Sequence, residues 1–156
     1  MEIAPRPESA YSIAMKRIGV VLIVILAFCG LSDSLYLAQH EAAGTPLICT
    51  VANLSGCNVV AASQYTHLFG ISIADYGVMF YAFVFIIAAL ELFVFDQLLR
   101  RIIQAASVIG VIASLYFTCI ELFVLHTVCI YCLTSAFIAL LVLIFACFIE
   151  PIRKKV

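Results

Sequence analysis

Four long apolar stretches constrain this chain of 156 residues more than any other feature. Hydrophobic residues make up 66% of the chain and charged residues 11%, whereas a soluble domain is about half apolar and about a quarter charged. Each stretch is long enough to cross the roughly 30 Å of hydrocarbon in a bilayer at about 1.5 Å per residue. The sequence therefore predicts an all-α integral membrane protein, a four-transmembrane-helix bundle forming one domain over 1–156. The expected spans are 18–38, 74–95, 102–125 and 128–149.

The distribution of basic residues predicts how the bundle is oriented. All Lys and Arg residues lie in the N-terminal arm, in the turn between the second and third spans, or in the C-terminal tail. The long connection 39–73 and the turn near His126 contain none. The positive-inside rule then places both termini in the cytoplasm and the long connection outside, and a bacterial inner membrane is the expected location. The basic residues are Arg6, Lys16, Arg17, Arg100, Arg101, Arg153, Lys154 and Lys155.

The outer connection 39–73 predicts a short lid helix. Asn58 is a good helix N-cap, mostly apolar residues follow it as far as Phe69, and Gly70 can end the helix. A helix of this composition would lie on the bundle rather than stand in water. It either covers a site among the helix ends or merely packs against them.

Cys129 and Cys132 form a C-x-x-C motif at the outer start of the fourth span. Residues three apart share a helix face, so the two sulfurs can form a disulfide or act together. Thr127 is expected to cap this helix and leave Cys129 in its first turn, where the helix dipole favours the nucleophilic thiolate. The alternative is that both cysteines simply pack as small apolar residues.

Cys49 and Cys57 form a second pair in the outer connection. The residues between them include Asn53, Ser55 and Gly56, so this segment is flexible enough for the pair to join and polar enough to stay at the surface. On its own the pair also fits a static disulfide that staples a loop. Two pairs on the same side of the membrane, one exposed and one at the boundary, instead suggest a relay by thiol–disulfide exchange.

The remaining metal-ligating residue types do not predict a metal site. Cys29, Cys119 and Cys147 fall inside spans and are assigned to packing, and the three histidines show no recognisable ligand spacing. His126 either stabilises the Cys129 thiolate or is an interfacial turn residue. The formal net charge of −1 and the lack of a basic stripe exclude a nucleic-acid-binding protein driven by charge. The histidines are His40, His67 and His126.

Ionisable residues inside membrane spans are costly and therefore functional suspects. Asp33 and Glu121 lie toward the outer ends of the first and third spans, where either could relay protons between thiols and a quinone. Glu91 lies nearer the cytoplasmic end and is expected to snorkel to the interface. Four tyrosines fit an aromatic belt at the interfaces, namely Tyr36, Tyr81, Tyr116 and Tyr131.

The cysteine motifs and their surroundings resemble a known family. The stretch from Cys49 to Tyr81 reads C-x7-C-N-V-V-x2-S-Q-Y-x3-F-G-I-x5-G-x3-Y, and Cys129-Ile130-Tyr131-Cys132-Leu133-Thr134 follows one helix later. This pattern resembles the vitamin K epoxide reductase family, particularly its bacterial and archaeal members. The similarity begins at Ser34-Leu35-Tyr36-Leu37 and covers nearly the whole chain. It implies a four-helix bundle that holds a quinone near the outer surface, next to the C-x-x-C motif.

The resemblance also implies roles for the four paired cysteines. Cys132 is expected beside the quinone, and Cys129 is expected to exchange with Cys49 and Cys57. In bacterial members, electrons pass from a periplasmic thioredoxin-like thiol oxidase through the loop pair to the C-x-x-C motif and on to the membrane quinone pool. The net reaction is disulfide bond formation in secreted proteins.

The family pattern further assigns quinone-binding residues. It places Ser63 on the lid helix near the quinone, and Tyr81 and Tyr131, which belong to the matching motifs, are expected there too. Vertebrate members usually carry a Tyr four residues after the second C-x-x-C cysteine, where this chain has Ala136. Many bacterial members carry a fused thioredoxin-like domain, whereas this chain ends at Val156. The thiol partner is therefore expected to be a separate protein.

The sequence thus predicts a quinone-dependent thiol oxidoreductase with ubiquinone or menaquinone as co-substrate. In the expected mechanism the Cys132 thiolate attacks the quinone ring and Cys129 resolves the adduct by forming the inner disulfide. One alternative is a quinone or vitamin K (epoxide) reductase whose product is the reduced quinone. A second is a cysteine-based carrier of a soft metal ion, although all four paired cysteines lie on the outer side.

Overall fold

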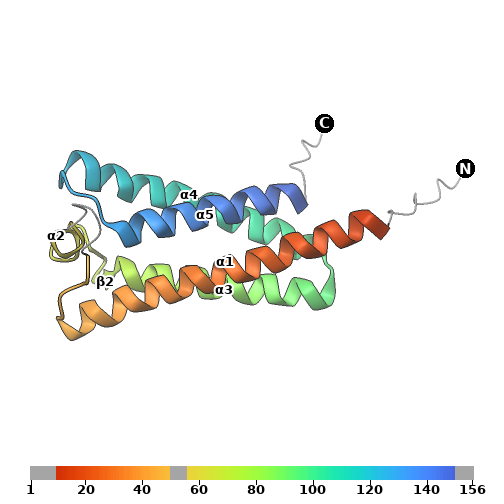
Figure 1. Ribbon diagram of the computed structural model, residues 1–156, viewed down its shortest axis with the longest axis horizontal. Helices are drawn as coiled ribbons and strands as arrows, with labels where there is room; N and C mark the ends of the chain where they lie inside the picture. Colours follow the sequence, from red (N-terminus) through yellow and green to blue (C-terminus); the bar gives the residue numbers. More distant parts are fainter. Residues whose placement is uncertain (1–9, 50–55, 150–156) are drawn as a thin grey trace, which may run out of the picture.

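The computed structural model describes residues 10–49 and 56–149, and four long helices dominate this part of the chain. They form an elongated bundle in which α1 packs on α3 and α5, and α4 packs on α5 and α3 (Figure 1). Each of the four is long and apolar enough to cross a membrane, which confirms the predicted bundle. The long helices are α1 (Ala10–Ala43), α3 (Ile73–Val94), α4 (Gln97–Phe123) and α5 (Ile130–Ile149).

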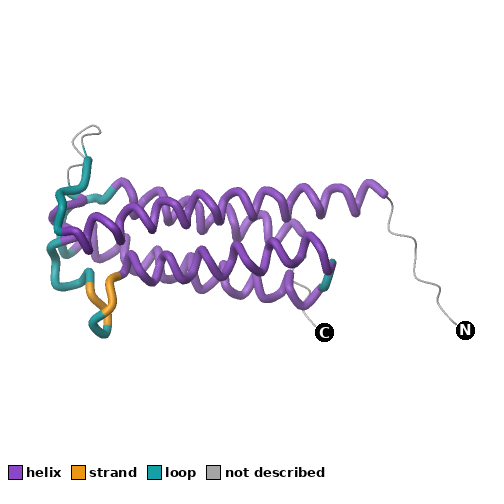
Figure 2. The backbone as a smooth tube through the Cα atoms, turned by 90° about the horizontal axis from the view of Figure 1, so that it is seen from below, coloured by secondary structure: helices purple, strands orange, loops and turns teal. Residues whose placement is uncertain are grey.

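The two ends of the bundle differ in structure. The short helix α2 (Cys57–Ala61) and the hairpin of β1 (His67–Leu68) and β2 (Ile71–Ser72) lie at one end, which we call the cap end (Figures 1 and 2). The opposite end holds the start of α1, the end of α5 and the short turn between α3 and α4. We call it the basic end because it carries the described basic residues, Lys16, Arg17, Arg100 and Arg101. The other basic residues, Arg6, Arg153, Lys154 and Lys155, lie outside the described residues.

Backbone hydrogen bonds at the cap end fix where α1 stops. Gly44 adopts the left-handed region with φ +61°, and its N–H donates to the Glu41 carbonyl over 3.1 Å. The next residue, Thr45, donates to the His40 carbonyl over 3.1 Å. These two bonds satisfy carbonyls that a helix end leaves without partners. As a result α1 extends well beyond the predicted 18–38.

The turn between α3 and α4 is shorter than predicted. It consists of Phe95, in the left-handed region at φ 51°, and Asp96, whose side chain accepts a hydrogen bond from the Leu98 N–H over 3.0 Å. This cap starts α4 at Gln97 rather than at the predicted 102. Arg100 therefore lies inside the first turns of a helix rather than in a loop.

Close contact between α1 and α3 depends on glycine. A β carbon at Gly30 would lie 2.4 Å from the Tyr81 ring, and one at Gly77 would lie 2.7 Å from Ser34 Oγ. Small residues at such positions let membrane helices approach each other closely. Tyr81 is consequently buried in the bundle, so the prediction that it belongs to an interfacial belt is wrong.

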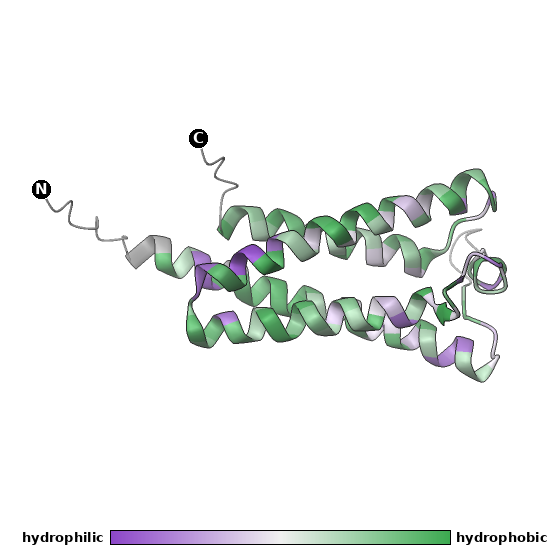
Figure 3. Ribbon diagram, turned by 180° about the vertical axis from the view of Figure 1, so that it is seen from behind, coloured by the Kyte–Doolittle hydropathy of each residue, from purple (hydrophilic) through white to green (hydrophobic). Residues whose placement is uncertain are grey.

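Apolar side chains cover the outside of the bundle as well as its core. Hydrophobic residues run along the middle of all four long helices, and hydrophilic residues gather toward the two ends (Figure 3). Cys29 and Cys119 are exposed on this apolar surface, so the prediction that they pack inside the protein is wrong. In a bilayer they would face lipid, where a thiol behaves as a small apolar group. Cys147 is half-buried beside Gln104.

The predicted lid helix exists but is built differently. Helix α2 has only five residues and Gly56 occupies its N-cap position, so the prediction that Asn58 caps it is wrong. Asn58 instead uses its side chain to hold the backbone of Leu47, accepting from its N–H over 2.8 Å and donating to its carbonyl over 3.3 Å. A clamp between α2 and the loop residue Leu47 therefore replaces the expected helix cap.

A β-hairpin takes the place of the expected continuation of the lid helix. Leu68 pairs with Ile71, and the turn between them has positive φ at both central residues, Phe69 (55°) and Gly70 (83°). Such a turn matches the twist of two antiparallel strands. The apolar residues Leu68 and Phe69 are therefore on a hairpin, and both are exposed.

A buried ion pair joins α3 to α4 at the basic end. Glu91 is only 1% exposed, and its Oε1 lies 2.5 Å from the Arg100 Nε. Its Oε2 accepts a hydrogen bond from the Asp96 N–H over 3.1 Å. The prediction that Glu91 snorkels to the interface is therefore wrong, because the short turn brings Arg100 back to it.

Removing Arg100 should destabilise the bundle strongly. Arg100→Ala leaves the Glu91 carboxylate buried without its cation, and breaking such a pair costs about 3–5 kcal/mol. Thermal unfolding in detergent should show a large fall in Tm for this variant. Arg101→Ala, which removes an exposed neighbour, is the matched control and should change Tm little. Equal shifts for the two variants would contradict this account of the ion pair.

Candidate active site

A cavity of about 340 Å³ lies within the cap end of the bundle. Its walls come from all four long helices, and α2 with the residues after it contributes Val60, Ala61 and Ser63. The lining is mostly apolar, with a few polar groups, which is typical of pockets for small organic molecules. The polar lining residues include Ser34, Glu41, Ser63, Thr66, Tyr81, Glu121 and Ser135.

The C-x-x-C motif lies at the start of α5 and faces this cavity. Cys129 directly precedes the helix, and its carbonyl accepts the Leu133 N–H over 3.0 Å. Cys132 lies in the first turn, and both cysteines line the cavity. The prediction that Thr127 caps α5 is wrong, since its hydroxyl has no hydrogen-bond partner among the described residues. The Cys129 N–H is instead bound by a carboxylate of α4, which leaves Cys129 just before the helix rather than in its first turn.

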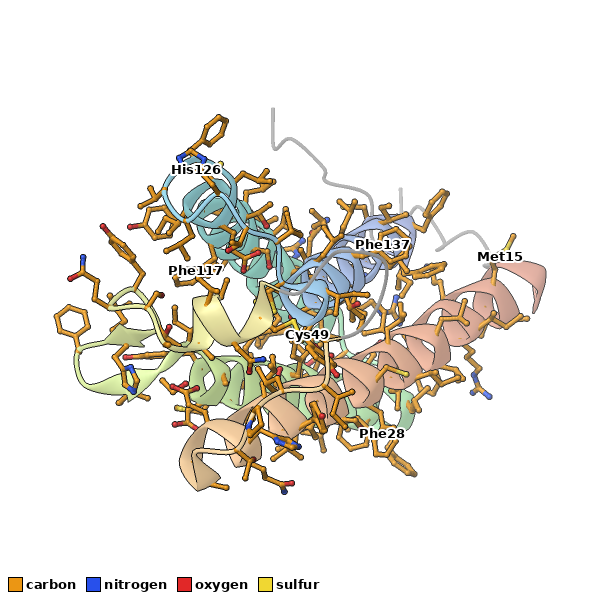
Figure 4. All side chains as sticks on the ribbon, turned by 60° about the vertical axis from the view of Figure 1, so that its left-hand side comes forward. Met15, Phe28, Cys49, Phe117, His126 and Phe137 are labelled. Atoms are coloured by element: carbon orange, nitrogen blue, oxygen red, sulfur yellow. A yellow bond between two sulfur atoms is a disulfide. The ribbon has the colours of Figure 1, made fainter. Side chains whose placement is uncertain are left out.

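The loop cysteines are joined and buried. Cys49 and Cys57 form a disulfide with a Cα–Cα distance of 6.3 Å. Their residues are only 7% and 1% exposed, so the prediction that this pair stays at the surface is wrong. Asn53 and Ser55, on which that prediction rested, lie outside the described residues. Figure 4 shows Cys49 between α2 and the ends of the long helices.

The loop disulfide packs directly on the C-x-x-C motif. Cys49, Cys57 and Cys129 belong to one buried cluster with Leu47, and Cys132 packs against its edge. Cys129 is itself only 2% exposed. The two cysteine pairs therefore lie within one packed cluster, as an exchange of disulfides between them would need.

Gly56 allows this contact. A β carbon at Gly56 would lie 2.7 Å from Thr127 Cβ and 2.9 Å from the Val128 carbonyl oxygen. The backbone that carries Cys57 therefore lies against the turn that leads into Cys129, at a distance that only glycine permits. The Asn58 clamp on Leu47 holds the other side of the loop.

Glu121, near the C-terminal end of α4, reaches the C-x-x-C motif. Its Oε2 accepts the Cys129 N–H over 3.2 Å, and the Cys132 side chain lies within hydrogen-bonding reach of the same carboxylate. Glu121 is 4% exposed and lines the cavity. Asp33, the other acidic residue proposed from the sequence as a proton relay, is not among the lining residues.

The surroundings of Cys129 favour its thiolate. A hydrogen bond from the Cys132 side chain is the largest effect and lowers the pKa of Cys129 below its ordinary value. Burial and the nearby Glu121 carboxylate oppose this lowering, and backbone hydrogen bonds from Cys132 and Tyr131 add to it. His126 lies in a turn at φ 50° and extends outward, away from Cys49 and the cap (Figure 4). This position agrees with the hypothesis that His126 is a turn residue rather than a group that stabilises the Cys129 thiolate.

The three residues expected at a quinone occupy different places. Ser63 and Tyr81 line the cavity, and the Tyr81 hydroxyl donates to the Ser135 carbonyl over 2.7 Å. Tyr131 is not among the lining residues. Its hydroxyl donates to the Ile48 carbonyl over 3.0 Å, beside the loop that carries Cys49.

Sequence reasoning missed the residues that tie the hairpin to α1. The Ser72 hydroxyl donates to the Glu41 carboxylate and also accepts the Ala74 N–H at the start of α3. His67 Nε2 lies 3.4 Å from Glu41 Oε1. The stretch from Ser72 to Asp75 matches an S-x-x-[DE] helix-start pattern, so this cap was visible in the sequence, whereas its bond to Glu41 was not.

Residues 21–147, most of the chain and all of the cavity, match the vitamin K epoxide reductase family. The chain belongs to this family. No individual curated protein matches it. Family membership makes the protein an integral membrane oxidoreductase whose thiol chemistry is linked to a quinone or to vitamin K. The matched region contains both cysteine pairs and Glu121.

The contact between the two pairs predicts a specific cross-link in this family member. With Cys49 and Cys132 both replaced by Ser, mild oxidation should join Cys57 to Cys129, because these two lie in one buried cluster. Mass spectrometry of proteolytic fragments will identify the bond. Adding Gly56→Ala should lower its yield by forcing the loop away from the turn. Pairing of Cys57 with a cysteine of the membrane spans would contradict the described contact.

The hydrogen bond between the two thiols predicts a change in titration. Cys132→Ala removes the main cause of the lowered pKa of Cys129, so this pKa should rise and the thiolate should form only at higher pH. The ultraviolet absorbance of the thiolate in the reduced protein, taken as a difference from a Cys129→Ala variant, will follow this titration. An unchanged or lowered midpoint would show that Cys132 does not stabilise the Cys129 thiolate.

Proposed function

We propose that this protein is a quinone-dependent thiol oxidase. The Cys49–Cys57 disulfide accepts two electrons from a dithiol partner, Cys129 and Cys132 receive them, and a membrane quinone takes them from the cavity. The observation that carries the proposal is the burial of the loop disulfide against Cys129, which itself lines the apolar cavity together with Cys132. A structural staple would need no contact with a second cysteine pair.

The environment of Cys129 supports transfer from the loop pair to the inner pair. When Cys49 and Cys57 are reduced and the inner pair is a disulfide, Cys57 attacks Cys129. Cys49 then attacks the resulting mixed disulfide at Cys57, and Cys129 leaves as a thiolate. A lowered pKa makes Cys129 a better leaving group in this last step. The structure has the loop pair bonded and the inner pair as thiols, the arrangement that follows this transfer.

The cavity fits a quinone as the electron acceptor. Its volume of about 340 Å³ lies in the usual range of small-molecule pockets, about 300–1,000 Å³, and its lining is mostly apolar. Cys132 lines this cavity, so in the proposed reaction it attacks the bound quinone and Cys129, three residues away, completes the inner disulfide. Ser63 and Tyr81 supply polar groups to the same lining. Ubiquinone and menaquinone are the expected membrane quinones.

The charge distribution supports an orientation and a partner. The described basic residues are at the end opposite the cap end, which by the positive-inside rule supports a cytoplasmic basic end and a periplasmic cap end in a bacterial inner membrane. Disulfides persist in that compartment. The proposed electron donor is therefore a periplasmic thioredoxin-like thiol oxidase, and the physiological outcome is disulfide formation in secreted proteins.

The alternative functions are less well supported. A quinone or vitamin K epoxide reductase would use the same cysteines, but Ala136 replaces the tyrosine that vertebrate members of the family usually carry. A soft-metal carrier needs several ligands held together. Among the described residues, no three His, Cys, Asp or Glu side chains gather in a way that could hold a metal ion.

Quinone reduction by the detergent-purified protein tests the proposal. With a reduced thioredoxin-like donor, the wild type should reduce a short-chain quinone, and Cys132→Ser should abolish turnover because the sulfur that attacks the quinone is lost. Cys57→Ser should lose turnover with the protein donor. It should still turn over with a small uncharged dithiol that reaches the inner pair through the cavity.

Cys29→Ser is the matched control, because Cys29 is exposed on the lipid-facing surface and should not affect either donor. Quinone reduction that persists without Cys132 would rule out the relay. Loss of activity in Cys29→Ser would show that the four-cysteine pathway is incomplete.

A further inference from the structure

The protein buries two glutamates in very different surroundings. Glu91 and Glu121 are 1% and 4% exposed. Glu91 is neutralised by Arg100 and accepts a backbone N–H, which explains its presence at the basic end. No ion pair accompanies Glu121 in the described part of the chain. Because a buried carboxylate without a cation is costly, a purely structural acceptor at this position would be better supplied by an amide.

Glu121 contacts both members of the inner cysteine pair. One carboxylate oxygen accepts the Cys129 N–H over 3.2 Å, and the Cys132 side chain lies within hydrogen-bonding reach of the carboxylate. All three residues line the cavity. A molecule bound in the cavity would therefore lie against the carboxylate and both sulfurs at once. A general acid–base residue needs such closeness to the reacting atoms.

We propose that Glu121 carries the proton between Cys132 and the quinone. This inference rests on the proposed function. Glu121 accepts the proton of the Cys132 thiol, so that the sulfur attacks the quinone as a thiolate, and it then donates this proton to a quinone oxygen. The Cys129 thiolate then attacks the Cys132 sulfur, which forms the inner disulfide and breaks the sulfur–carbon bond to the quinone. The proton that Cys129 lost on ionising returns from water to the second quinone oxygen. Two thiols and one quinone thus become one disulfide and one quinol, with two electrons and two protons transferred.

The other acidic residues near the cavity are less suited to this role. Glu41 lines the cavity, but its carboxylate is engaged by Ser72 and lies beside His67 in the cap. Asp33 does not line the cavity. The titratable groups that share the cavity with Glu121 are Cys129, Cys132, Glu41, Tyr65, Tyr76 and Tyr81, so the test must separate Glu121 from these.

Glu121→Gln separates proton transfer from structure. A glutamine oxygen can still accept the Cys129 N–H, but the amide cannot exchange a proton. The fully reduced protein is mixed with a short-chain ubiquinone in a stopped-flow instrument across a range of pH and in heavy water. We expect the single-turnover rate to fall about 100-fold, as general acid–base residues commonly contribute about 10²–10⁴-fold. The Tm and the KM for the quinone should stay close to wild type.

The pH profile and the isotope effect distinguish a proton carrier from a positioning residue. In Glu121→Gln, the single-turnover rate should no longer vary with pH where the wild-type rate follows the titration of Glu121. Glu121→Asp should restore part of the rate. Asp33→Asn is the matched control, because it neutralises an acidic residue of α1 that does not line the cavity and should leave the rate near wild type. Transfer from the loop pair to the inner pair, measured without quinone, should be little affected by Glu121→Gln.

Two results would overturn the inference. If Glu121→Gln matches the wild type in rate, pH profile and heavy-water effect, Glu121 is only a hydrogen-bond acceptor for Cys129, and the proposed function stands without it. If the wild type reduces no quinone while its cysteine pairs still exchange, both the proposed function and the role of Glu121 fail.

Discussion

The lack of hydrogen-bond partners in a bilayer is the constraint on which this structure depends. Four helices satisfy their own backbone across the apolar region, so irregular backbone is confined to the ends. One end needs only Phe95 and Asp96 to turn the chain. The other carries α2, the hairpin and the turn into α5, and it can therefore hold a disulfide against a C-x-x-C motif. The position of the chemistry follows from where the membrane permits loops.

The same constraint makes the placement of charge informative. A carboxylate inside such a bundle is costly unless a cation pairs with it or it serves the chemistry of a site. The chain has one buried glutamate of each kind, at opposite ends of the bundle. Glu91 is held by Arg100 across the α3–α4 turn, whereas Glu121 is directed at Cys129 and Cys132. Glycines complete the arrangement, because Gly56 lets the loop that carries the disulfide approach the inner pair. A buried glutamate thus stabilises the helix pair at one end of the bundle and contacts the cysteine pair at the other.

The sequence predicted the four spans and the cysteine pairs, since apolar length and motif spacing are properties of the chain itself. It predicted how far along their spans Glu121 and Glu91 lie, but not which side chains they contact. The position of Arg100 inside α4 is not predictable from composition, because the two-residue turn before it carries no distinctive residues. Asn58 looked like a helix cap, and its actual partner, Leu47, is eleven positions earlier. Burial of the loop disulfide depends on such long-range contacts, so a polar sequence around it was misleading.

Burial of the Cys49–Cys57 disulfide also has a kinetic consequence for any thiol that would reduce it. A thiolate must approach a disulfide in line with the sulfur–sulfur bond, and Cys49 and Cys57 are only 7% and 1% exposed in the described part of the chain. Small thiols dissolved in water should therefore reduce this disulfide slowly. A protein that displaces the residues around the disulfide as it binds would react faster, so its rate would depend on binding energy as well as on redox potential. Selectivity of this kind is kinetic, and it requires no special chemistry at the sulfur atoms.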